Sequence, residues 1–134
     1  MGQNITRSVL DLVAEADAAV DRFSIAEGLE MLGRDDVLFV DIRDVREVAK
    51  TGRIKGARHV PRGMLEFWID PESSYHREVF VSGKRFVFFC AGGLRSVLAA
   101  QAVQHMGLKP VAHIAGGFAA WKEAGGTTVA KEKK

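Results

Sequence analysis

The sequence of 134 residues lacks the features that mark several classes of protein. It has a single cysteine, so no internal disulfide can form, and this favours a reducing compartment such as the cytoplasm. No apolar run approaches the length of a membrane span, and the N-terminus lacks the basic-then-apolar order of a signal peptide. We therefore expect a cytoplasmic protein that does not associate with a membrane.

The chain is also poor in net charge and in metal-ligand patterns. Its 19 basic and 17 acidic residues leave a net charge of +2, which is too small to indicate a nucleic-acid partner. The four histidines have no companions at metal-ligand spacing, so we expect no metal site. With 47% apolar and 27% charged residues, the composition is that of one globular domain.

The only cysteine ends a run that is typical of a buried strand. Residues 86–89 read Phe-Val-Phe-Phe, apolar on both faces as in a central parallel strand. Gly92 and Gly93 then give a tight turn, and an alanine-rich helix is predicted from Ser96 to Met106. Cys90 is therefore expected at the carboxyl end of a strand, facing the amino end of a helix, where ligands bind in open parallel sheets.

This position favours the thiolate form of Cys90. The two glycines let backbone N–H groups of residues 91–96 point inward as an anion-binding nest, and the helix dipole and Arg95 add positive charge. Because the thiolate is the reactive form of cysteine, we expect an ionised nucleophile that solvent can reach. The alternative is a buried structural cysteine.

Helical and strand patterns alternate along the chain. They predict helices over residues 8–20, 24–33, 44–52 and 64–69, strands over 37–40 and 111–114, a short strand that Pro61 ends, and a last helix after Gly116-Gly117. The Gly116-Gly117 pair would allow close backbone approach beside the loop that follows Cys90. Such alternation predicts an α/β fold with a mostly parallel sheet and helices on both faces.

Some side chains carry further expectations. Asp41 follows the strand at 37–40, and its carboxylate would either accept N–H bonds of the neighbouring loop or pair with an arginine. Aromatic residues 67, 68 and 75 are expected in the core rather than in a pocket wall, and Trp121 is expected to fill the core. In the first helix we expect an apolar stripe and a solvated acidic face, formed respectively by Val9, Val13, Ala16 and Val20, and by Asp11, Glu15 and Asp17.

Three separated motifs resemble those of the single-domain rhodanese family. The six-residue loop from Cys90 to Arg95, followed by Ser96, resembles the active loop. The first motif comprises Asp41-Ile42-Arg43, Glu47, Gly52, Ile54, Gly56-Ala57 and Pro61, and the closing motif comprises Gly116-Gly117-Phe118, Trp121 and Gly125. The resemblance implies a three-layer sandwich over residues 22–128, preceded by an extension with a helix (1–21) and followed by a polar tail (129–134).

The resemblance also implies a sulfurtransferase that needs no cofactor. Cys90 would take the outer sulfur of a small anionic donor such as thiosulfate as a persulfide, and cyanide, a thiol or a sulfur-accepting protein would remove it. Donor binding would fall to Ala91, Gly92, Gly93, Leu94, Arg95 and Ser96, with Asp41 and Arg43 in support.

Three alternatives stay open at this point. The chain could be a persulfide carrier, a binding module without activity, or a cysteine-dependent phosphatase or arsenate reductase. Loops of the phosphatase class place five residues between cysteine and arginine, whereas four separate Cys90 from Arg95, and Ser96 occupies the longer spacing. The shorter loop suits a single sulfur better than a phosphoryl group.

Overall fold

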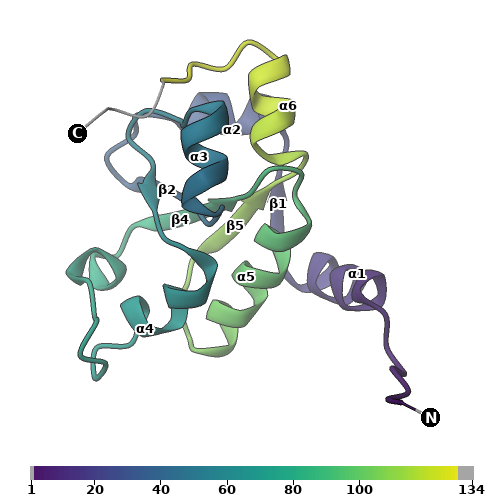
Figure 1. The fold of residues 1–134 in the computed structure, drawn as a ribbon. Coiled ribbons are helices and arrows are strands. Elements are labelled where there is room, and N and C mark those ends of the chain that lie inside the picture. The colour runs from purple at the N-terminus through teal and green to yellow at the C-terminus, as the bar shows by residue number, and fades with distance from the viewer. Residues whose placement is uncertain (1, 130–134) are drawn as a thin grey trace.

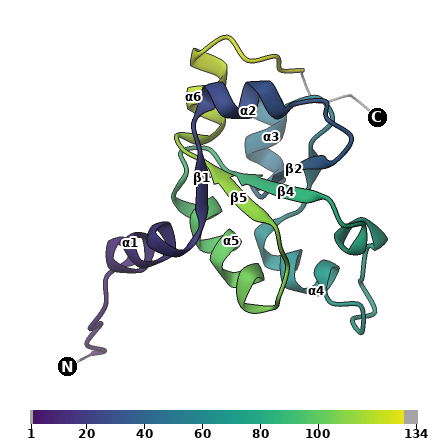
Figure 2. The ribbon, with the colours of Figure 1, turned by 180° about the vertical axis from the view of Figure 1, so that it is seen from behind.

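A five-stranded parallel sheet forms the centre of the computed structural model, which describes residues 2–129 (Figures 1 and 2). Its strands are β1 (Asp21–Phe23), β2 (Val37–Asp41), β3 (Arg58–His59), β4 (Arg85–Phe89) and β5 (Val111–Ile114). They lie in the order β1-β5-β4-β2-β3, and every neighbouring pair is parallel. The predicted α/β fold with a parallel sheet is confirmed.

Helices cover both faces of this sheet, as predicted. The α-helices of the described residues are α1 (Val9–Ala19), α2 (Ile25–Met31), α3 (Val45–Thr51), α4 (Leu65–Ile69), α5 (Leu94–His105) and α6 (Gly117–Glu123), and short 3-10 helices span Arg62–Met64 and Glu78–Val81. Helices α2, α3 and α6 lie on one face, and α1, α4 and α5 lie on the other (Figures 1 and 2). Within residues 2–129, no helix is long and apolar enough to cross a membrane.

Three of these helices begin with a capping box. In each, the side chain of the N-cap residue accepts a backbone N–H of the first turn, and an acidic side chain of that turn accepts the backbone N–H of the N-cap residue. The pairs are Ser8 with Asp11, Ser24 with Glu27, and Asp44 with Glu47. The predicted starts at residues 24 and 44 are therefore confirmed. Helix α5 begins at Leu94, two residues before the predicted Ser96, since Gly93 serves as its N-cap with a φ of 104°.

The core divides along β4, whose side chains alternate between the two faces of the sheet. Phe88 and Cys90 face the side of α1, α4 and α5, where Val97 and Leu65 join the same buried cluster. Residues 87 and 89 face the other side and pack with Trp121, which fills the core as predicted. Cys90 therefore belongs to the layer between the sheet and α5.

The N-terminal region differs from its prediction in three respects. Strand β1 was not expected, and it pairs with β5 at the edge of the sheet. Val9 is exposed and does not belong to the buried stripe. Of the four residues predicted for that stripe, only Ala16 and Val20, the C-cap, are buried. Asp17 does not lie on a purely solvated face, since its carboxylate contacts Arg22 and His113.

The predictions for the middle and the end of the chain also need correction. Phe67 and Tyr75 are exposed rather than buried, whereas Trp68 packs partly against the core with the Arg77 guanidinium over its ring. Val129, the first residue of the predicted tail, forms an isolated antiparallel bridge with Arg53. The rest of that tail, residues 130–134, lies outside the described residues.

Candidate active site

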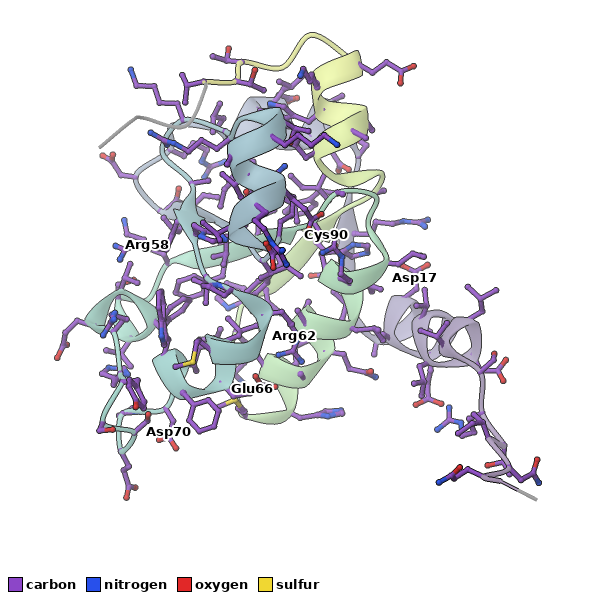
Figure 3. All side chains as sticks on the ribbon, in the orientation of Figure 1. Asp17, Arg58, Arg62, Glu66, Asp70 and Cys90 are labelled. Atoms are coloured by element: carbon purple, nitrogen blue, oxygen red, sulfur yellow. The ribbon has the colours of Figure 1, made fainter. Side chains whose placement is uncertain are left out.

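Cys90 directly follows β4, between the amino ends of α3 and α5 (Figure 3). The backbone N–H of Gly93 donates to Cys90 Sγ at 3.1 Å. Gly93 has a φ of 104°, a left-handed conformation that glycine adopts without steric penalty. The loop thus turns one of the predicted N–H donors toward the sulfur.

The sulfur is more deeply placed than the sequence predicts. Cys90 is only 1% exposed, so the expectation of a nucleophile open to solvent is wrong for this conformation. The physical reason is the alternation of β4, which points this side chain under α5. Two loop side chains, Leu94 and Arg95, are exposed and lie toward solvent.

The start of α6 holds the loop from the opposite side. The N–H of Phe118 donates to the Cys90 carbonyl at 2.8 Å, and the N–H of Ala119 donates to the Ala91 carbonyl at 3.0 Å. Gly117 makes this approach possible, because a Cβ at that position would lie 2.4 Å from the Cys90 oxygen. The predicted close approach of the Gly116-Gly117 turn to the active loop is confirmed.

Asp41 fills both of the roles that the sequence left open, because it pairs with an arginine and accepts an N–H bond from the loop that follows it. Its carboxylate accepts bonds from Nε of Arg43 at 3.0 Å and from Nη2 at 2.7 Å. It also accepts the backbone N–H of Arg43 at 3.1 Å. The side chains of Arg43 and Asp41 are 1% and 2% exposed, so this is a buried ion pair.

The buried guanidinium of Arg43 joins three elements of the fold. It donates to Thr51 Oγ1 at 2.9 Å and to the Gly52 carbonyl at 2.8 Å, both at the end of α3. It also lies 4.2 Å from the ring centroid of Phe118 in α6. Asp41 and Arg43 therefore support the active loop indirectly. Arg43 packs against α6, and the N–H groups at the start of α6 bind the carbonyls of the loop.

Arg95 forms an ion pair that the predicted site did not include. Its Nη1 and Nη2 donate to the two carboxylate oxygens of Glu47 at 2.8 and 2.9 Å. These bonds lower the pKa of Glu47 to about 2. The pKa of Arg95 is raised, first by the bonds to Glu47, against partial desolvation, and further by its interaction with the nearby Cys90 side chain. Arg95 thus lies beside both the carboxylate and the sulfur.

Ser96 lies behind the loop rather than at its open side. Its side chain is fully buried, and its hydroxyl donates to the Gly93 carbonyl at 3.2 Å. The hydroxyl also lies 3.4 Å from His113 Nδ1. Neither His113 nor Glu47 is predicted in the site from the sequence, because neither belongs to the local pattern around Cys90.

A cavity of about 530 Å³ opens beside the loop, between α3 and α6. It reaches the loop at Ala91, and its other walls include Glu47, Lys50, Phe118 and Lys122. In the described part of the chain, no group of three or more histidine, cysteine, aspartate or glutamate side chains is placed to hold a metal ion.

Comparisons with known proteins agree with this geometry. The rhodanese-like domain family matches residues 24–124. A solved structure from Rhodopseudomonas palustris, of a protein of unknown function described as a possible tyrosine phosphatase, is 50% identical, covers 96% of this chain and 99% of its own, and has a TM-score of 0.93.

The names of two curated relatives contain the term thiosulfate sulfurtransferase. The thiosulfate sulfurtransferase GlpE of Pseudoalteromonas translucida is 28% identical, over 79% of this chain and 92% of its own. The mouse thiosulfate sulfurtransferase/rhodanese-like domain-containing protein 3 is 27% identical over 68% of this chain, which spans 61% of the mouse protein. On the strength of the matched domain, its order of motifs and its fold, this chain belongs to the rhodanese-like domain family.

Proposed function

We propose that this protein is a sulfurtransferase, which carries a sulfane sulfur from an anionic donor such as thiosulfate to cyanide or a thiol. The observation that supports it most is the lone Cys90, whose sulfur accepts the Gly93 N–H at 3.1 Å beside the Arg95 guanidinium. A backbone donor and a fixed positive charge both favour an anionic sulfur. The sulfurtransferase names of curated family members point the same way.

The reaction would proceed in two displacements at one sulfur. Cys90 thiolate attacks the outer sulfur of thiosulfate, the S–S bond of the donor breaks, and sulfite leaves with the electron pair. The new persulfide ends in an anionic sulfur, which the loop N–H groups and Arg95 would stabilise. An acceptor then attacks that outer sulfur, and Cys90 leaves as thiolate.

The burial of Cys90 requires that the donor displace part of the loop surface. The Arg95 and Glu47 side chains are 45% and 35% exposed, and exposed ion pairs contribute only about 0–1 kcal/mol. An anionic donor can therefore replace the Glu47 carboxylate as the partner of Arg95 at small cost. In this proposal Arg95 moves with the donor, while the Gly93 N–H keeps its contact with the sulfur.

The phosphatase alternative is less well supported by the loop. Four residues separate Cys90 from Arg95, and Ser96 at the next position is buried and uncharged. A phosphoryl group needs positive charge and several donors around its equatorial oxygens. The loop from Cys90 to Arg95 is one residue shorter than the phosphatase loops, so it offers fewer backbone donors and less room for such a group.

Sulfur loading from thiosulfate is the direct test. We expect the intact mass of the reduced protein to rise by one sulfur atom after incubation with thiosulfate, and to return to its original value after cyanide is added. An aryl phosphate assay on the same sample should give no hydrolysis. Repeated turnover with cyanide would distinguish an enzyme from a carrier, and phosphate release without sulfur loading would contradict the proposal.

Arg95→Ala is expected to impair reaction with an anionic donor selectively. We would measure two rates on Cys90, loading from thiosulfate and alkylation by neutral iodoacetamide. Because both depend on the same thiolate, their ratio isolates the attraction between Arg95 and the donor charge. Loss of about 1.4 kcal/mol of that attraction would lower the ratio about tenfold. An unchanged ratio would remove Arg95 from donor binding.

A further inference from the structure

A chain of polar contacts connects α1 to the active loop. Ser96 Oγ lies 3.2 Å from the Gly93 carbonyl oxygen and 3.4 Å from His113 Nδ1. On the other side of the imidazole, His113 Nε2 lies 3.4 Å from Asp17 Oδ1. In Figure 3, Asp17 stands at the end of α1 that faces the start of α5. This series of polar contacts thus ends at Gly93, the residue whose N–H faces the sulfur.

Burial restricts what Ser96 and His113 can do. Ser96 is 0% exposed and His113 is 4% exposed. Serine, histidine and aspartate also form the catalytic triad of hydrolases, but there the hydroxyl must reach a substrate carbonyl. The Ser96 hydroxyl instead contacts a backbone carbonyl of its own chain. These residues therefore act on the loop rather than on a substrate.

The protonation of His113 decides where the single hydroxyl hydrogen of Ser96 points. When the imidazole is neutral and its Nε2–H donates to Asp17, Nδ1 carries a lone pair and competes with the Gly93 carbonyl for that hydrogen. When the imidazole is protonated, Nδ1–H donates to the Ser96 oxygen instead. The hydroxyl hydrogen is then available only to the Gly93 carbonyl.

We propose that Asp17 and His113 are positioning residues for the sulfur site, and that protonation of His113 directs the Ser96 hydroxyl onto the Gly93 carbonyl and so fixes the residue that donates to Cys90. The consequence for sulfur transfer rests on the function proposed above. The structural coupling does not. Helix α1, which precedes the matched family domain, becomes part of the site.

The charges around His113 come from two elements. Asp17 on α1 lies against Nε2, and Arg22 on β1 is the register partner of His113 and also contacts Asp17. Within the sheet, the neighbour on β4 is the apolar Phe88, and α5 contributes the uncharged Ser96. Burial lowers the pKa of His113 below its usual 6.5, Asp17 opposes this, and the charge of Arg22 adds to it.

Contacts along α1 hold Asp17 in this place. Gln104 in α5 donates from Nε2 to the Ala19 carbonyl at 3.1 Å, and Ala16 is fully buried against the core. A cavity of about 170 Å³ remains between α1 and the loop, with Asp17, His113 and Gly93 among its walls. The loop therefore has space to shift when the polar chain changes.

Nuclear magnetic resonance of the full chain tests the coupling without any reaction. In the labelled Cys90→Ser variant, where no thiol titrates, the Gly93 amide shift should follow the His113 ring shift with one midpoint below pH 6.5. Asp17→Asn should move both midpoints to lower pH, and Arg22→Gln should move both to higher pH. In Ser96→Ala, His113 should still titrate while the Gly93 amide stays flat.

A matched control is available on the same helix. Glu15 is also acidic and pairs with Arg7 at the surface, away from His113, so Glu15→Gln should leave both midpoints unchanged. A Gly93 amide that stays flat while His113 titrates would overturn the proposal. So would a His113 that stays neutral until the protein unfolds, or a midpoint that Asp17→Asn does not move.

A kinetic measurement separates this inference from the proposed function. The rate of sulfur loading from thiosulfate, divided by the thiolate fraction, should rise about threefold as the pH falls through the His113 midpoint. This step should be absent in Ser96→Ala and unchanged in Glu15→Gln. If no protein is loaded with sulfur but the Gly93 amide still follows His113, only the proposed sulfurtransferase function would be rejected. Normal loading with a flat Gly93 amide would reject only the positioning role.

Discussion

Replacing Cys90 with serine is expected to abolish sulfur loading completely while leaving the fold in place. No second cysteine exists in the chain to take over, and a serine hydroxyl is not ionised at neutral pH. The serine oxygen can still accept the Gly93 N–H, so the loop keeps its hydrogen bond. We expect a stability loss of about 1 kcal/mol, because a buried hydroxyl costs more to remove from water than a thiol does.

Intact mass after incubation with thiosulfate and a thermal melt provide the two measurements. The Cys90→Ser protein should show no added sulfur, and its melting temperature should fall by no more than about 5 °C. Cys90→Ala is the companion variant, since it removes the acceptor of the Gly93 N–H as well as the nucleophile. A large fall in melting temperature for both variants, with no sulfur loading by the parent protein, would instead indicate a structural cysteine.

The strand, loop and helix around Cys90 could be predicted because their signals are local. An apolar run, two glycines and an alanine-rich segment follow one another within residues 86–106. The same holds for α2 and α3, whose caps lie within four residues of sequence. Strand β1 gave no such signal, since its three residues, Asp-Arg-Phe, carry neither alternation nor an apolar run. Its pairing with β5 depends on the sheet that is already there.

The partners of the site's charged and polar groups could not be predicted, for a related reason. Arg95 and Glu47 are 48 residues apart, and His113 and Asp17 are 96 residues apart. The parallel order of the strands places Glu47 and Arg95 together, because they follow the carboxyl ends of the neighbouring strands β2 and β4. The packing of α1 against α5, in contrast, brings Asp17 to His113. The depth of Cys90 likewise depends on how closely α5 packs on β4, which a one-dimensional pattern does not contain.

Asp41→Ala is expected to destabilise the protein by about 3–5 kcal/mol, the second large effect. The substitution leaves the Arg43 guanidinium buried without a carboxylate, although its bonds to Thr51 and Gly52 persist. Urea unfolding measures this loss as a shift in midpoint at constant slope. Replacing both partners, as in Asp41→Leu with Arg43→Met, should cost less than Asp41→Ala alone, because no unpaired charge stays in the interior.

The chain offers an exposed pair for comparison. Arg34 also bonds Asp36 through two nitrogen atoms, at 3.1 and 3.0 Å, but both side chains are largely exposed. Asp36→Ala should therefore shift the urea midpoint far less than Asp41→Ala. Equal shifts would mean that burial of the Asp41 pair carries no special weight. If the shift is large, Asp41→Ala should also slow sulfur loading, because Arg43 packs on Phe118, whose N–H holds the Cys90 carbonyl.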